Sequence, residues 1–66
     1  MITLTRINNK KIAINISQIE YIEEIPETKI VMMNGKFHII KESLDEMLEK
    51  IIEYNKKIFV DINRTN

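Results

Sequence analysis

The fold is decided by the stretch from Thr28 to Tyr54, which reads TKIVMMNGKFHIIKESLDEMLEKIIEY. Two apolar runs within it, Ile30–Met33 and Phe37–Ile40, flank the dipeptide Asn34-Gly35. An Asn-Gly pair between strand-like runs is the strongest short signal of a β-hairpin, because a type I′ turn needs positive φ at both central residues. The sequence therefore predicts two antiparallel strands joined by a type I′ turn.

A single amphipathic helix is predicted directly after this hairpin. Beyond Ser43 the apolar side chains change from a strand-like to a helical spacing. They are Leu44, Met47, Leu48, Ile51 and Ile52. Ser43 and Glu46 fit a capping box, in which the serine hydroxyl and the glutamate carboxylate each accept the other residue's backbone N–H. We expect a helix from Leu44 to about Lys57.

The first part of the chain carries a second hairpin pattern. Residues Met1–Ile7 and Lys11–Ser17 alternate apolar with polar or small side chains, which is typical of strands with one buried face. Asn8-Asn9 between them suits a tight turn, since Asn tolerates positive φ better than most residues. After a bend or a single helical turn at Ser17–Glu20, a third strand is predicted at Tyr21–Ile25.

The segment Ile58–Ile62 is apolar apart from Asp61, and two interpretations of it stay open. It could extend the helix, or it could form a sixth strand, which its β-branched content favours. The last residues, Asn63–Asn66, are expected to fray, as chain ends commonly do. The domain prediction is therefore a single α+β domain over 1–62 followed by a frayed tail over 63–66.

The predicted fold class is α+β, with a small, mainly antiparallel sheet of about five strands packed by one C-terminal amphipathic helix. We expect the hydrophobic core to combine alternate strand positions with the apolar face of the helix. The predicted core residues are Ile2, Leu4, Ile12, Ile14, Ile22, Ile30, Met32, Leu44, Leu48, Ile51 and Ile52.

Composition excludes several classes of protein. The chain has 66 residues, no Cys and one His, which excludes disulfides and the usual zinc sites. Its net charge is zero, whereas a nucleic-acid-binding protein normally carries a basic excess. No apolar run approaches the roughly 20 residues that span a bilayer, and no signal peptide is recognised. We expect a cytoplasmic protein without a cofactor.

Catalytic residues are hard to find. One Gly excludes a glycine-rich phosphate loop. His38 is the one imidazole, and we interpret it as an ordinary exposed or interface residue of a strand; the alternative is a general base, which would need a nucleophile or an orienting carboxylate within reach. Ser17 and Ser43 have local backbone roles, so neither is a credible nucleophile. The sequence predicts a protein that is not an enzyme.

An acidic cluster precedes the central hairpin. Its members are Glu20, Glu23, Glu24 and Glu27. Adjacent strand residues point to opposite faces, so Glu23 and Glu24 cannot form a working carboxylate pair. The cluster is either a solvated edge or a docking surface for a basic partner.

The predicted fold has more apolar surface than its one helix can cover. The central hairpin carries apolar side chains on both faces, and a helix can cover only one of them. Methionines at Met32, Met33 and Met47 could fill the core or form a soft recognition surface. Ile58, Phe59 and Val60 add a further apolar segment, whose exposure would forfeit several kcal/mol at about 25 cal/mol per Å². This segment should therefore be buried, either back on its own sheet in a monomer or in a neighbouring chain. We favour the second, self-association into a homo-oligomer through Ile58, Phe59 and Val60.

The order of residues resembles the FlbD/SwrD family of small bacterial proteins of flagellar motility and swarming. The resemblance lies in MITLTRIN at 1–8, IEYIEEIPET at 19–28, MNGK at 33–36 and KESLDEMLEKI at 41–51, and it covers about residues 1–57. It implies a cytoplasmic accessory protein, associated with the flagellar base, that acts through contact with a flagellar protein. The family supplies no catalytic residues. Its usual Asn-Gly-Lys at the first turn is replaced here by Asn8-Asn9-Lys10.

Two other resemblances lead to a different function, a small nucleic-acid-binding regulator. Met1–Arg6 is similar to the opening of carbon-storage-regulator RNA-binding proteins, but the Gly- and Arg-rich continuation is missing. Ile19–Ile51 is similar to the sheet-to-helix part of LytTR DNA-binding domains, but the chain is shorter and lacks the expected basic face. This function is kept as the alternative.

Overall fold

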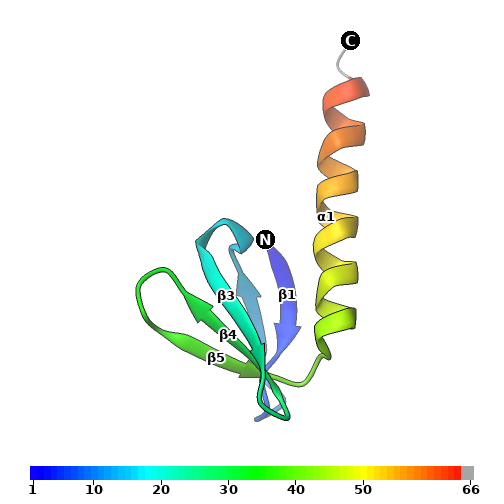
Figure 1. Ribbon diagram of the computed structural model, residues 1–66. Helices are drawn as coiled ribbons and strands as arrows, with labels where there is room; N and C mark the ends of the chain where they lie inside the picture. Colours follow the sequence, from blue (N-terminus) through cyan, green and yellow to red (C-terminus); the bar gives the residue numbers. More distant parts are fainter. Residues whose placement is uncertain (65–66) are drawn as a thin grey trace.

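Five short strands precede one long helix (Figure 1). The computed structural model describes the backbone of residues 1–64 and the side chains of residues 1–57. The elements are β1 Ile2–Thr5, β2 Lys11–Ile14, the 3₁₀ turn η1 Ile16–Gln18, β3 Ile19–Glu24, β4 Thr28–Met32, β5 Phe37–Ile40 and α1 Leu44–Arg64. The α+β class, the antiparallel pairing and the C-terminal helix confirm the sequence prediction.

The strands form two sheets instead of the one that was predicted. β1 pairs with β2 in one sheet, and the other has the order β3-β4-β5. An isolated antiparallel bridge between Arg6 and Ile40 joins them. Beside it the Lys41 N–H donates to the Thr5 carbonyl at 2.8 Å. The link is short because β1 turns away into its own hairpin directly after Arg6.

Both hairpins use the same three-residue turn. In the first, the Asn9 N–H donates to the Arg6 carbonyl at 2.9 Å and the φ of Asn9 is 69°. In the second, the Gly35 N–H donates to the Met32 carbonyl at 2.9 Å and the φ of Gly35 is 85°. Asn34 does not have positive φ, so the predicted type I′ turn is wrong. A type I turn followed by one left-handed residue closes this longer loop, and only the third position needs positive φ.

The helix begins as predicted and ends later. The Ser43 N–H donates to Glu46 Oε1 and the Glu46 N–H donates to Ser43 Oγ, both at 3.1 Å, so the capping box is confirmed. The helix continues through Ile58–Ile62, and the strand that β-branched content favoured there is wrong. Each residue added to an existing helix gains one backbone hydrogen bond for the conformational freedom that it loses. A new strand gains its hydrogen bonds only where the edge of another strand is free to pair with it. The remaining residues, 65–66, lie outside the described structure, and fraying at 63–66 stays a prediction.

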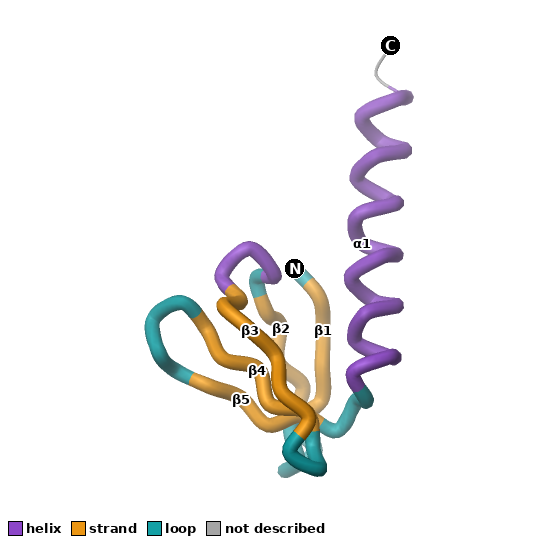
Figure 2. Tube along the Cα trace, viewed as in Figure 1, coloured by secondary structure: helices purple, strands orange, loops and turns teal. Residues whose placement is uncertain are grey.

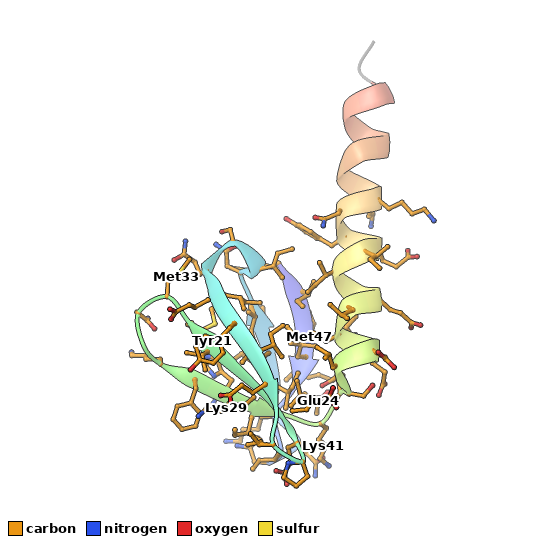
Figure 3. All side chains as sticks on the ribbon, viewed as in Figure 1. Tyr21, Glu24, Lys29, Met33, Lys41 and Met47 are labelled. Carbon is orange, nitrogen blue, oxygen red and sulfur yellow. The ribbon has the colours of Figure 1, made fainter. Side chains whose placement is uncertain are left out.

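The core is built from the two sheets and one side of α1. Its fully or almost fully buried side chains are Ile2, Leu4, Ile14, Ile30, Ile40 and Met47. Ile12, Ile22, Met32 and Ile51 pack around them and are half-buried. Leu48 and Ile52 were predicted in the core but are 43% and 60% exposed, because α1 turns the line Leu44, Met47, Ile51 and Tyr54 toward the strands. Figure 3 shows Met47 pointing from α1 toward the strands.

A short loop leads from β5 to α1 (Figure 2). Within it, the Glu42 side chain ties the loop to β1. The Glu42 carboxylate accepts the Thr5 N–H at 2.9 Å and the Thr5 hydroxyl at 3.0 Å. Burial raises the pKa of Glu42, but the backbone hydrogen bonds from Thr5 and Glu42, the Thr5 hydroxyl and the charge of Lys50 outweigh it and hold the pKa below its usual value. The Glu42 carbonyl also accepts the buried Thr28 hydroxyl at 2.7 Å. These bonds set where the helix starts relative to the sheets.

Candidate interaction surfaces

The outer face of the three-stranded sheet is apolar and faces away from α1. The register places Tyr21, Val31 and Phe37 in one row across the three strands. The next row on the same face contains Glu23, Lys29 and Ile39. Tyr21 is 48% exposed and Phe37 is 57% exposed, while Val31 between them is buried. Both faces of the β4–β5 hairpin are therefore apolar, as the sequence predicted. Figure 3 shows Tyr21 and Lys29 on the side of the sheet away from α1.

An open cleft of about 520 Å³ lies beside this face, and we call it the turn cleft. Its lining residues come from the β1–β2 turn and from the segment that leads out of the β4–β5 turn along β5. They are Arg6, Ile7, Asn8, Gly35, Lys36, Phe37, His38 and Ile39. The lining holds three basic side chains, no acidic one, and two apolar side chains, Ile7 and Phe37, that are each 57% exposed. The lining of the turn cleft thus combines the positive charges of Arg6 and Lys36 with exposed apolar side chains at its rim.

Arg6 and His38 meet in the turn cleft. Arg6 Nη2 lies 3.4 Å from His38 Nδ1, and Arg6 Nε is buried with no hydrogen-bond partner. Burial lowers the pKa of His38, and the charges of Arg6 and Lys36 lower it further. The lowered pKa favours the neutral imidazole. Because the guanidinium can only donate, its contact with Nδ1 fits the tautomer in which Nδ1 accepts. His38 is half-buried and points to the side opposite Phe37, where its neighbour is a cation and not a nucleophile or a carboxylate.

Sequence analysis missed Arg6, although one signal was available. Strand alternation puts position 6 on the same face as Ile2 and Leu4, so an arginine stands where the pattern calls for a core residue. No local pattern could have shown that this residue meets His38, which lies 32 positions later in the chain. Lys36 was quoted as part of the hairpin signature without any functional role.

The acidic cluster does not form a single face. All four carboxylates are exposed. Glu20 lies at an irregularity in the register of β3, and Glu23 is opposite Lys29 on the outer face. Glu24 points to the other side of the strand and lines a separate cleft of about 580 Å³ with Glu27 and Lys41. Docking of a basic partner on Glu20, Glu23, Glu24 and Glu27 stays a prediction.

The helix offers another exposed surface. Leu48 and Ile52 lie on the side of α1 that the strands leave uncovered. The backbone of Ile58, Phe59 and Val60 is helical, and their side chains lie outside the described residues. Self-association through these three residues therefore stays a prediction. A groove of about 520 Å³ between α1 and β1 is acidic, since Glu46, Glu49 and Glu53 line it.

The described residues include neither a metal-binding group nor a membrane-spanning helix. No group of three or more His, Cys, Asp or Glu side chains is placed to hold a metal ion. No described helix is both long enough and apolar enough to cross a membrane.

Comparison with known proteins identifies a family. Residues 1–59 match the family model FlbD, described as flagellar and swarming motility proteins. No curated protein and no solved structure matches the chain. The match covers both hairpins, the capping box and the part of α1 that packs on the core. Because it spans most of the 66 residues, the chain belongs to the FlbD family of flagellar and swarming motility proteins.

Proposed function

We propose that this member of the FlbD family is a non-enzymatic adaptor or modulator of the flagellar apparatus, which acts by binding another protein. We place its action in the cytoplasm, at the flagellar base. The proposal is carried by one observation, the apolar outer face of the three-stranded sheet, where the aromatic side chains of Tyr21 and Phe37 are exposed. Exposed apolar patches next to polar residues mark interaction sites, because leaving them in water is unfavourable.

The chemistry of this face supports a protein partner. Tyr and Phe are enriched in the centres of protein interfaces, since they offer a large rigid contact area. Val31 lies between Tyr21 and Phe37 and is buried, so the row is continuous across the sheet. Two residues that sequence analysis considered for catalysis have other contacts here: Ser43 caps α1, and His38 lies against Arg6. The motility role of the family gives the setting in which such contact would matter.

Complementation of a deletion strain tests the proposal. We expect deletion of the gene to impair swimming or swarming while growth stays normal, and the unaltered gene to restore motility. Phe37→Asp should fail to restore it, because a charge in place of this exposed ring prevents an apolar contact. Ile25→Asp is the matched control, since it puts the same charge on an exposed isoleucine next to the β3–β4 turn. Circular dichroism should show both variants folded.

Normal motility in the deletion strain would remove the basis of the proposal. If Phe37→Asp at normal protein levels restores motility, the contact with the partner does not involve this face. Failure of Ile25→Asp together with Phe37→Asp would show that any added charge is harmful, and the face would lose its special role.

A nucleic-acid-binding regulator is the second candidate, and one contact favours it. Lys29 Nζ lies 4.7 Å from the centre of the exposed Phe37 ring, and aromatic side chains among basic ones are typical of single-strand binding. The zero net charge weighs against it, because phosphate neutralisation drives such binding. Gel shifts with RNA and duplex DNA at physiological salt separate the two candidates. Tight binding there would favour the regulator.

A further inference from the structure

The guanidinium of Arg6 lacks an anionic partner among the described side chains. Its hydrogen-bond neighbour is the His38 ring, and Nε is neither paired nor exposed. An arginine in a partly buried position normally pairs with a carboxylate or a phosphate, because its planar fork matches two oxygens at once. Lys36 adds a second positive charge to the same cleft. A molecule with zero net charge therefore concentrates uncompensated positive charge at one place.

The rim of the turn cleft is suited to more than a bare anion. Ile7 and Phe37 are each 57% exposed, and both line the turn cleft together with Arg6 and Lys36. The cleft continues onto the outer face of the sheet, because Phe37 belongs to both surfaces. A ligand that contacted both the cations and the apolar side chains of the cleft would carry a negative group next to an apolar one.

We propose that the turn cleft binds an acidic segment of a partner protein. A glutamate or aspartate side chain of that segment pairs with Arg6 and Lys36, and a neighbouring apolar side chain packs on Ile7 and Phe37. This inference rests on the proposed function, and it adds the chemistry of the partner and the place of its anchor. The cation of Lys29 over the Phe37 ring extends the positive charge along the path of the segment.

Two other occupants fit less well. A nucleic acid would need a basic track along its backbone, whereas Glu23 lies beside Lys29 on the outer face. A second copy of the chain could offer the acidic groove of Glu46, Glu49 and Glu53, but those carboxylates stand next to Lys50 in that groove. Both occupants are outcomes of the test below.

The binding test uses the full isotope-labelled chain and three probes, followed by amide chemical shifts. The probes are a short peptide that alternates glutamate with leucine, the same peptide with glutamine in place of glutamate, and a single-stranded oligonucleotide of equal charge. We expect the acidic peptide to shift amides at Arg6–Asn8 and Gly35–Ile39, and the glutamine peptide to bind at least tenfold more weakly. Added salt should weaken the acidic peptide, because exposed charges are screened.

Several results would overturn the inference. They are shifts outside the turn cleft, equal binding of the glutamine peptide, and tighter binding of the oligonucleotide. Shifts at the cleft that grow with protein concentration without peptide would assign the cleft to a second copy instead.

Two lysine variants give a matched pair. Lys36 and Lys10 follow the left-handed residue of identical turns, and the N–H of each donates to an Asn side chain at 3.0 Å. Both side chains are exposed, but only Lys36 is among the residues that line the turn cleft. Lys36→Glu should weaken the acidic peptide at least tenfold, and Lys10→Glu should leave binding within twofold. Equal effects of the two would contradict a specific site. Arg6→Gln should also weaken binding of the acidic peptide. If this variant does not fold, the comparison of Lys36→Glu with Lys10→Glu decides the question.

The same variants separate this inference from the proposed function. If Phe37→Asp abolishes swarming while Lys36→Glu binds the acidic peptide normally, the acidic partner is refuted and the adaptor stands. If the deletion strain swarms normally, the adaptor falls, and the peptide titration still decides the chemistry of the turn cleft.

Discussion

Two residues in the hairpin turns hold the backbone in a conformation that most side chains avoid. Gly35 has a φ of 85°, and Asn9 at the equivalent place has a φ of 69°. Asn is one of the few residues other than glycine that visit this region readily, which explains how Asn8-Asn9-Lys10 and Asn34-Gly35-Lys36 form the same turn. The difference in sequence at the first turn therefore leaves its geometry unchanged.

A substitution at Gly35 measures the cost of this backbone conformation alone. A Cβ at Gly35 would have no atom within 4 Å, so Gly35→Ala adds no clash. We expect a loss of about 1–2 kcal/mol in the free energy of unfolding, because alanine is disfavoured at positive φ. Urea unfolding followed by circular dichroism measures it. An unchanged midpoint would mean that the turn can relax to another type.

Glu42 predicts how stability depends on pH. Its pKa is held below the ordinary value of 4.5, so its carboxylate stabilises the folded state above that pH, and the contribution is lost as the pH falls through the folded pKa. Glu42→Gln should cost about 1 kcal/mol at pH 7, a reduced value because the hydrogen bonds are only partly buried. The variant should also lose part of the acid sensitivity. Unfolding curves at several pH values test this, with the exposed Glu27→Gln as control.

At the scale of elements, local patterns predicted most of what was found. Alternation located β1 and β2, the apolar runs beside Asn34-Gly35 located β4 and β5, and the Ser43–Glu46 spacing located the start of α1. Periodicity could not show which side of α1 faces the strands, because apolar residues cover a wide arc of this helix. Met47, for which the sequence left a core position and a recognition surface open, is fully buried, and Leu48, predicted in the core, is 43% exposed. The strand that β-branched content favoured at Ile58–Ile62 is wrong, because residues that extend a helix form their hydrogen bonds within it and need no second strand.

The orientation of α1 can be tested with two neighbouring residues. Met47 is fully buried, and Leu48 is 43% exposed. Met47→Ala should cost about 2–5 kcal/mol, since it removes buried atoms and leaves a cavity. Leu48→Ala should cost less than half as much, and both changes suit a helix. Chemical denaturation of both variants gives the comparison, and a larger loss at Leu48 would mean that the helix is rotated.

At the scale of the whole molecule, the turn cleft was beyond sequence analysis. Its two halves come from residues 6–8 and residues 35–39, and the bridge between Arg6 and Ile40 brings them together. The net charge of zero hid the local positive charge. The acidic cluster was visible in the sequence, but Glu23 and Glu24 point to opposite faces of β3, and Glu27 lies between β3 and β4. Charged residues that are neighbours in a strand sequence point to opposite faces, so they do not form one charged surface. Charged residues far apart in the sequence can form one when tertiary contacts bring them together.

Self-association is expected for the intact chain. The figures show α1 extending well past both sheets, and Leu48 and Ile52 lie exposed along it (Figures 1 and 2). We expect light scattering at micromolar concentration to give a multiple of the 7.9 kDa chain mass. Phe59→Asp should reduce that mass if Ile58, Phe59 and Val60 form the interface. A mass of one chain that Phe59→Asp does not change would refute the oligomer.

The composition of the core has a consequence for the time course of folding. Met47 packs in one cluster with Ile2 and Leu4, and Glu42 bonds to Thr5 across 37 positions. The β1–β2 sheet is a single two-stranded hairpin, which is marginal in water by itself, so it has no stable core until the first turns of α1 exist. On the ribosome, the N-terminal hairpin must therefore wait until α1 has been synthesised. Contacts between residues far apart in the chain form late in folding, and the apolar strands stay open to chaperones during the delay.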